Sequence, residues 1–197
     1  MKPACDTREK LLHVALRLIW EASYGSVSVD DICRQAGVKK GSFYYFFPSK
    51  SDLTAAAMQM HWEEQKADLD AIFSPQHSAP ERISAYCEYV RSRQAAKREH
   101  YGKVCGCPMV TLGAELSTQD ETIRRKTAEI MDGYVTYFAS VARDLPGVPD
   151  PAAAGRRLFA YSQGLMLQAK VHNDLSPLDE LKPGMLRFLE TQSQTQF

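Results

Sequence analysis

The sequence lacks the features that mark membrane and secreted proteins. Its 197 residues contain no apolar run near the ~18 residues that a membrane-spanning helix needs, and no signal-peptide pattern opens the chain. The five cysteines are odd in number and have no framework spacing, which argues against a secreted scaffold held by disulfides. We therefore expect a cytoplasmic protein with reduced cysteines and no membrane partner.

Enzyme signatures are also missing. The five histidines are scattered, and no Ser-His-Asp order, phosphate-binding loop or HExxH motif occurs. Cys105 and Cys107 form a Cys-x-Cys pair with only His100 nearby, so a metal site lacks its further ligands. We expect no enzyme, no metal and no cofactor. The alternative is a thiol-based redox enzyme, which turnover with a peroxide and a thiol donor would reveal, but Cys105 is a poor resolving partner for Cys107.

What the chain does have is helical periodicity along almost its whole length. Its 44% apolar and 24% charged residues are ordinary for a globular protein. Capping residues precede several apolar-periodic segments, and no β-hairpin signal stands out. We predict an all-α protein, with a first helix capped by Asp6 and with helices over 6–22, after Ser28, over 39–47, 49–72, from Pro80, over 108–116, 118–143, 152–171 and around 185–189.

Residues 28–50 predict a helix-turn-helix. Ser28, with Asp31 three residues on, is an N-cap pair that opens a helix, and Gly37 suits the tight turn that follows. The next segment, 39–47 (KKGSFYYFF), concentrates groups that suit phosphates and base edges. The chain has no net charge, but residues 39–50 carry three lysines and no acid, and a local patch decides phosphate attraction within a Debye length of ~8–10 Å. The segment therefore predicts binding to duplex DNA, since a merely solvated basic surface leaves the adjacent tyrosines unexplained.

The same residues resemble a known family. Residues 39–47, followed by Ser49, Lys50 and Leu53, are similar to the signature of the TetR family of transcriptional repressors. The resemblance implies an all-helical repressor with a helix-turn-helix DNA-binding domain over 1–53 and a ligand-sensing, dimerisation domain over 54–197. It also implies a palindromic operator that an inducing signal releases. Phe46 departs from the family, which often has a histidine or another polar residue there, and this puts one phosphate contact in doubt.

The resemblance also implies roles for single residues. Lys40 and Lys50 would meet phosphates, and Gly41 would let the backbone approach the DNA closely. Ser42 and Tyr44 would face base edges or a thymine methyl. Ser28, at a helix start, would offer its backbone N–H to a phosphate. The DNA-binding residues predicted in this way are Ser28, Lys39, Lys40, Gly41, Ser42, Tyr44, Tyr45 and Lys50.

Residues 158–169 bear on assembly. This segment is apolar or small nearly all the way round, so other elements must cover it on more than one side. It is either a central core helix or, with the helix over 118–143, a four-helix interface between two subunits. The family resemblance and the low specificity of a single helix-turn-helix favour a homodimer.

Cys107 is the candidate sensor. Pro108 favours the first helical position, which places Cys107 at the N-cap, where the positive end of the helix dipole lowers the pKa of a thiol. Residues 106–115 and 167–170 resemble a TetR subgroup that includes the repressor of N-ethylmaleimide reductase, which responds to electrophiles and oxidants through a cysteine matching Cys107. Lys170 would hold the thiolate if it lies nearby. Inert packing of Cys107 is the competing interpretation.

Two inducing signals stay open. Covalent modification of Cys107 would disturb the helix over 108–116 and, through neighbouring helices, the long helix that begins at Ser49. A reversible small apolar ligand in the regulatory domain is the alternative. Side chains that would line its cavity serve equally well as core: Tyr86, Tyr89, Met109, Tyr134, Phe138, Tyr161 and Met166. An adaptor that binds no DNA is a further class, which a gel shift on the chain's own upstream region would separate from a repressor.

Overall fold

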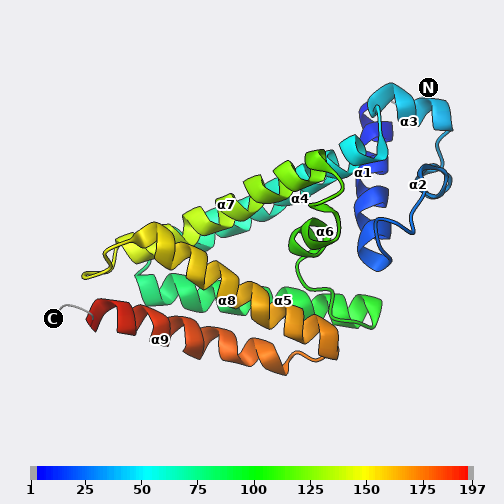
Figure 1. Cartoon of the computed structure of the whole chain (residues 1–197). Coiled ribbons are helices and arrows are strands. Elements are labelled where there is room, and N and C mark those ends of the chain that lie inside the picture. Colours follow the sequence, from blue (N-terminus) through cyan, green and yellow to red (C-terminus); the bar gives the residue numbers. More distant parts are fainter. Residues whose placement is uncertain (1–3, 195–197) are drawn as a thin grey trace. The chain divides into compact units, whose positions relative to one another are not determined.

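The computed structural model describes residues 4–194, and side chains over residues 6–191 (Figure 1). The chain is 79% helical, and the described residues form no strand, which confirms the predicted all-α class. Among these residues, no helix is long and apolar enough to cross a membrane. The helices are α1 (Ala4–Glu21), α2 (Val29–Ala36), α3 (Lys40–Phe46), α4 (Lys50–Ile72), α5 (Ala79–Tyr101), α6 (Pro108–Leu116), α7 (Glu121–Arg143), α8 (Pro151–His172), the 3₁₀ turn η1 (Ser176–Glu180) and α9 (Leu181–Gln194).

The chain forms two compact units. The N-terminal unit contains the residues up to 65 together with 108–130, and the C-terminal unit contains 66–107 together with the residues from 131 on. The chain crosses from one unit to the other inside α4, between Cys107 and Pro108, and inside α7. This division differs from the predicted boundary after residue 53, because α6 and the start of α7 belong to the N-terminal unit. The boundary of the DNA-binding domain itself stays a prediction.

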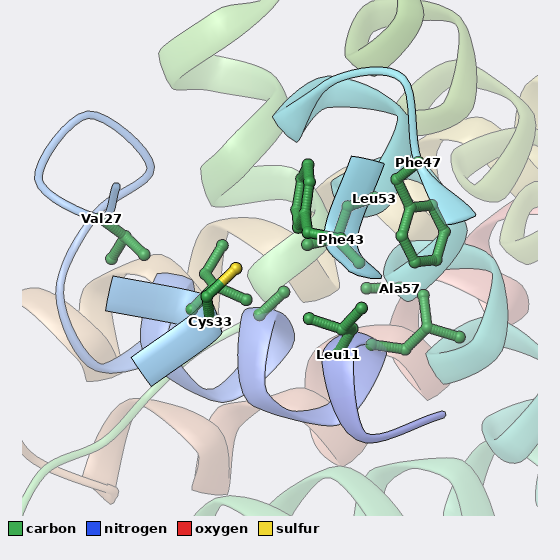
Figure 2. Packing of buried hydrophobic residues seen from close by; sticks show 10 residues of the cluster. Leu11, Val27, Cys33, Phe43, Phe47, Leu53 and Ala57 are labelled. Carbon is green, nitrogen blue, oxygen red and sulfur yellow. The ribbon is translucent and has the colours of Figure 1, made fainter. Parts of the chain in front are cut away.

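The N-terminal unit is built around one apolar cluster. Leu11 of α1, Phe43 of α3 and Leu53 of α4 are fully buried in it, and Phe47 packs into it directly after α3 (Figure 2). Ile32 of α2 is fully buried in the same cluster. Within one helix, buried members of the cluster recur three or four residues apart, as do Leu11 and Ala15 on α1 and Leu53 and Ala57 on α4, so each helix turns one apolar face to the others. Burying a phenylalanine side chain stabilises a fold by ~1.5–3 kcal/mol, which lets a helix as short as α3 keep its place.

Three details of the helix boundaries differ from the prediction. Asp6 is not an N-cap, because α1 begins at Ala4 and Asp6 pairs inside it with Lys10 at 2.7 Å. The helix predicted from residue 118 begins at Glu121, because the Asp120 side chain accepts the Ile123 N–H at 3.1 Å and caps α7 there. The turn η1 before α9 was not predicted.

The C-terminal unit packs α5, α8 and α9 around aromatic side chains. The rings of Tyr86 on α5 and Phe138 on α7 meet edge to face with centroids 4.8 Å apart, and both side chains are fully buried. On α8, Gly155 faces the backbone of α7, where an added Cβ would come within 2.7 Å of the Val135 carbonyl oxygen. Gly155 is therefore the residue that allows these two helices to approach closely.

Candidate DNA-binding surface and thiol site

The helix-turn-helix forms as its local signals predict. The Ser28 side chain accepts the Asp31 N–H at 3.1 Å, and the Asp31 carboxylate accepts the Ser28 backbone N–H at 3.0 Å. The Asp31 carboxylate also accepts hydrogen bonds from the Ser28 hydroxyl and from Arg34, and together with the bond from the Ser28 N–H these lower the pKa of Asp31 to about 2. Gly37 ends α2 in the left-handed region at φ 65°. The Ser28 N–H is thus used by the cap, and we no longer assign it to a phosphate.

Helix α3 carries the exposed aromatic and basic groups. Tyr44 and Tyr45 are 51% and 80% exposed, whereas Phe43 on the same helix is fully buried in the core. Gly41, Lys39 and Lys40 are exposed as well, and Ser42 is half-buried. Large exposed aromatic side chains are costly to leave in water, so two adjacent ones beside lysines mark a binding surface. This arrangement can hold a polyanion on one face of a short, well-anchored helix.

Lys40 has a partner in the free protein. Its Nζ lies 2.9 Å from the Asp30 carboxylate on α2, and hydrogen bonding to that carboxylate raises the pKa of Lys40. Both side chains are largely exposed, so the pair is weak and a phosphate can replace the carboxylate. Lys40 therefore stays a candidate phosphate contact.

Lys50 is placed differently from the prediction. Its Nζ donates to the carbonyl oxygens of Tyr24 and Val27 at 2.8 Å each and lies 3.7 Å from the centroid of the Tyr24 ring. Burial lowers its pKa, with Glu115 acting in the opposite direction. Lys50 is directed into the protein, and sequence reasoning missed this because its acceptors are backbone atoms far along the chain.

Cys107 directly precedes α6, in a loop that is held from two sides. On α5, the buried Gln94 accepts the Gly106 N–H at 2.9 Å and donates to the Gly106 carbonyl at 3.1 Å. At the end of α8, the Asn173 side chain accepts the Val104 N–H at 2.9 Å. Gln94 and Asn173 carry no sequence signal for this role, and only the tertiary structure identifies them.

Lys170 and Lys97 both lie close to this loop. A Cβ added at Gly106 would come within 3.1 Å of the Lys170 Cδ, so the Lys170 stem packs on the residue before Cys107, a proximity that the sequence could not show. Lys97 is half-buried on α5, one turn beyond Gln94. Burial lowers the pKa of Lys97 to about 8, while negative charge at Cys107 acts to raise it. One lysine thus interacts electrostatically with Cys107, and a second packs on the residue before it.

None of the four cysteines whose side chains are described forms a disulfide, and the four differ in their exposure to solvent. Cys33, Cys87 and Cys105 are buried, whereas Cys107 is half-exposed. Burial raises the pKa of Cys33, and it raises that of Cys87 to about 12, so their thiolate fraction near neutral pH is small. The fifth, Cys5, lies outside the side chains described. Among the described thiols, Cys107 is the one open to a reagent.

Most of the residues suggested for an apolar ligand cavity are buried and pack as core. Tyr86 and Phe138 pack on each other, and the Tyr134 ring stacks on the Phe159 ring with centroids 5.6 Å apart. Tyr161 points to the surface side of α8, donating to the Glu180 carbonyl at 3.1 Å. The remaining members are Tyr89, Met109 and Met166, of which Met109 belongs to the N-terminal unit. Most of these side chains act as core, and the cavity stays a prediction.

Comparison with known proteins places the chain in a family. Residues 11–57 match the model of bacterial regulatory proteins of the tetR family. Over 179 residues the chain is 31% identical to an uncharacterized HTH-type transcriptional regulator in the lacX 3′ region of Lactococcus lactis, a match that covers 88% of each protein. The chain belongs to the tetR family. The resemblance noted in residues 39–53 is confirmed.

Other members support the same assignment along most of the chain. The HTH-type transcriptional repressor NemR of Escherichia coli K12 is 25% identical over 181 residues, covering 88% of this chain and 89% of NemR. The crystal structure of E. coli NemR in its reduced form matches with a TM-score of 0.80 and covers 92% and 96% of the two chains. The transcriptional regulator AcuR of Cereibacter sphaeroides is 26% identical over 192 residues, covering 94% and 86%. This tetR-family member is accordingly a DNA-binding transcriptional regulator and not an enzyme.

Proposed function

We propose that the protein is a cytoplasmic, homodimeric repressor that binds a palindromic operator through α3 and releases it when Cys107 is modified by an electrophile or oxidant. One observation carries the proposal: Cys107 is the last residue of the C-terminal unit, and the next residue opens α6 in the unit that contains the helix-turn-helix. A group added to this thiol acts at the point where the chain enters the DNA-binding unit.

The surroundings of Cys107 support selective reaction at this thiol. A nearby ammonium group stabilises a thiolate over a thiol, and Lys97 and Lys170 both lie beside the loop that carries Cys107. Gln94 fixes the Gly106 peptide through two hydrogen bonds, so an adduct cannot be accommodated by free movement of the loop. The modified form must therefore favour another arrangement of the loop and of the start of α6.

Release follows only if modification favours the form that does not bind DNA. Helix α6 packs closely on α7 within the N-terminal unit, because Gly113 leaves no room for a Cβ beside Thr127. A shift of α6 at Pro108 therefore disturbs its packing on this unit. We propose this helix as the element that transmits the change towards α4 and the recognition helices.

The dimer interface is proposed on α8. Its exposed face carries Ala160, Gly164, Leu167 and Val171, and the last two side chains are 59% and 71% exposed. Apolar side chains aligned on one helix face, with small residues that allow close approach, fit a second copy of the same helix. In the C-terminal unit the exposed positions of α7 are polar, so we leave α7 out of the interface that the sequence suggested.

The test is operator release measured by fluorescence anisotropy, using a DNA fragment from upstream of the chain's own gene. N-ethylmaleimide or hypochlorite should release the wild-type protein, and Cys107→Ser should stay bound with Cys5, Cys33, Cys87 and Cys105 intact. Cys105→Ser is the matched control and should respond like wild type. Unchanged release of Cys107→Ser would remove Cys107 as sensor and leave the reversible apolar ligand as the better account.

A further inference from the structure

The loop between α1 and α2 is held by a lysine that the family resemblance assigns to DNA. Lys50, the first residue of α4, donates to the carbonyl oxygens of Tyr24 and Val27 at 2.8 Å, and its ammonium group lies over the Tyr24 ring. The Val27 side chain is itself buried in the core of the N-terminal unit (Figure 2). The loop that leads into α2 is thus attached to α4 by both its backbone and its side chain.

Helix α6 holds the same loop from another direction. The Glu115 carboxylate accepts the Gly25 N–H at 3.3 Å, and Glu115 also interacts electrostatically with Lys50. The basic group on α4 and the acidic group on α6 therefore both bind backbone atoms within the four-residue stretch 24–27. The contacts lie within the N-terminal unit, although Glu115 is separated from Gly25 by 90 positions in the sequence.

A second set of hydrogen bonds ties the loop to the start of α7. The Tyr24 hydroxyl lies 3.1 Å from the Ser51 Oγ, and Ser51 donates to the Asp120 carboxylate. Asp120 in turn caps α7 through the Ile123 N–H. The loop before α2 is consequently fixed to α4, α6 and α7, and the helix-turn-helix begins directly after it.

We infer that Lys50 and Glu115 are positioning residues for operator binding, which hold the α1–α2 loop in place, and that Lys50 makes no phosphate contact. The ammonium group of the half-buried Lys50 gives two of its three N–H groups to these carbonyls, and a move of the side chain to the DNA would leave both carbonyls unpaired. The inference rests on the proposed operator binding and extends it. It makes α6, the helix that follows Cys107, a direct support of the DNA-binding element.

The salt dependence of operator affinity separates positioning from phosphate contact. Each phosphate contact contributes about 0.9 to the slope of log K against log salt. Lys50→Met should weaken binding roughly tenfold or more at every salt concentration while leaving this slope unchanged. Lys39→Met is the matched control, because Lys39 is exposed beside α3, and its loss should lower the slope by about 0.9.

For Glu115, the charge explanation and the positioning explanation predict changes of opposite sign in operator affinity. Removing an acidic group near DNA strengthens binding if charge alone matters, whereas the positioning role predicts weaker binding by Glu115→Ala. Glu115→Gln keeps an acceptor for the Gly25 N–H and should recover part of the affinity. Glu129→Ala removes the same charge from α7 in the N-terminal unit and should not weaken binding.

Wild type must first bind its operator, and failure there is a failure of the proposed function, not of this inference. A slope reduced by about 0.9 in Lys50→Met would overturn it. Equal or tighter binding by Glu115→Ala would do the same. If Lys50→Met does not fold, as judged by circular dichroism, the comparison of Glu115→Ala, Glu115→Gln and Glu129→Ala still decides.

Discussion

Replacing Gly106 by alanine perturbs the loop that carries Cys107 without touching the thiol. Gly106 has a φ of +68°, a left-handed conformation that costs other residues ~1–2 kcal/mol. A Cβ there would lie 3.1 Å from the Lys170 Cδ and 3.7 Å from the Met166 carbonyl oxygen. The Lys170 stem must therefore move by a few tenths of an ångström, and the two hydrogen bonds of Gln94 to Gly106 must follow the changed backbone.

The size of the effect follows from opposing contributions. Alanine restricts the unfolded chain, which stabilises the folded state by ~0.4–1 kcal/mol and offsets part of the cost of the left-handed conformation. The net backbone effect therefore lowers the free energy of unfolding by about 0.5–1 kcal/mol. Crowding against Lys170 adds about 1 kcal/mol, the lower end of the range for overpacking. Gly102→Ala is the matched control, because Gly102 has a φ of +69° at the other end of the same loop and a Cβ there meets nothing within 4 Å.

Two measurements check this prediction. In thermal unfolding, the melting temperature of Gly106→Ala should be about 2–4 °C lower than that of Gly102→Ala, because 1 kcal/mol shifts the melting temperature of a chain of this size by about that amount. In alkylation by N-ethylmaleimide, only Gly106→Ala should change the rate at Cys107. Combining it with Lys170→Ala should remove the difference in stability, as expected for two residues in contact. Equal stability and equal alkylation rates for the two glycine variants would refute the packing argument.

Two other predictions concern assembly and charge. Leu167→Glu places a charge on the exposed apolar face of α8 and should convert the dimer to a monomer in sedimentation at micromolar concentration, while Thr136→Glu on an exposed position of α7 should not. Burial lowers the pKa of Lys97 from 10.5 to about 8, so between these pH values the unfolded state holds a proton on Lys97 that the folded state has lost. The free energy of unfolding should therefore rise from pH 8 to 10.5. Lys97→Met should flatten that rise, seen in urea unfolding, and should slow alkylation of Cys107 at pH 7 more than Lys97→Arg does.

The helix-turn-helix could be predicted because its determinants are local. The cap of Ser28 with Asp31 spans three residues, and the Gly37 turn needs only a residue that tolerates positive φ. The apolar spacing that buries Phe43 is likewise contained in one helix. Such signals act over one or two turns, and a single sequence displays them in full.

The surroundings of Cys107 could not be predicted in the same way. Gln94 lies in a polar stretch of α5 that reads as a solvated helix face, yet it is buried and binds the backbone of Gly106 twelve positions later. Asn173 reaches Val104 across 69 positions. A glutamine or asparagine has the same local preferences whether it faces water or a loop, so only the packing of distant helices assigns these roles.

Lys50 is a residue whose charge could be recognised in the sequence but whose contacts, like those of Gln94 and Asn173, depend on distant parts of the chain. A lysine after a recognition helix suits a phosphate, and the sequence contains nothing that opposes this interpretation. Its carbonyl acceptors lie 23 and 26 positions earlier, and Glu115 lies on a helix that the prediction placed in the other domain. The charge was evident from the sequence, but the direction of the side chain depends on how α6 folds back onto the N-terminal unit.

The chain passes between the two units at three points, and these differ in stiffness. The difference matters for where a chemical modification can change the path of the chain. Two of them lie inside continuous helices, α4 and α7, where a bend must break hydrogen bonds of the helix ladder. The third, between Cys107 and Pro108, joins a loop to the first turn of α6, where the N–H groups have no partner within the helix. A change of path there disrupts no helical turn. In the proposed mechanism, a chemical group added at Cys107 would therefore act on the crossing that bends most easily, and Glu115 lies two turns further along α6.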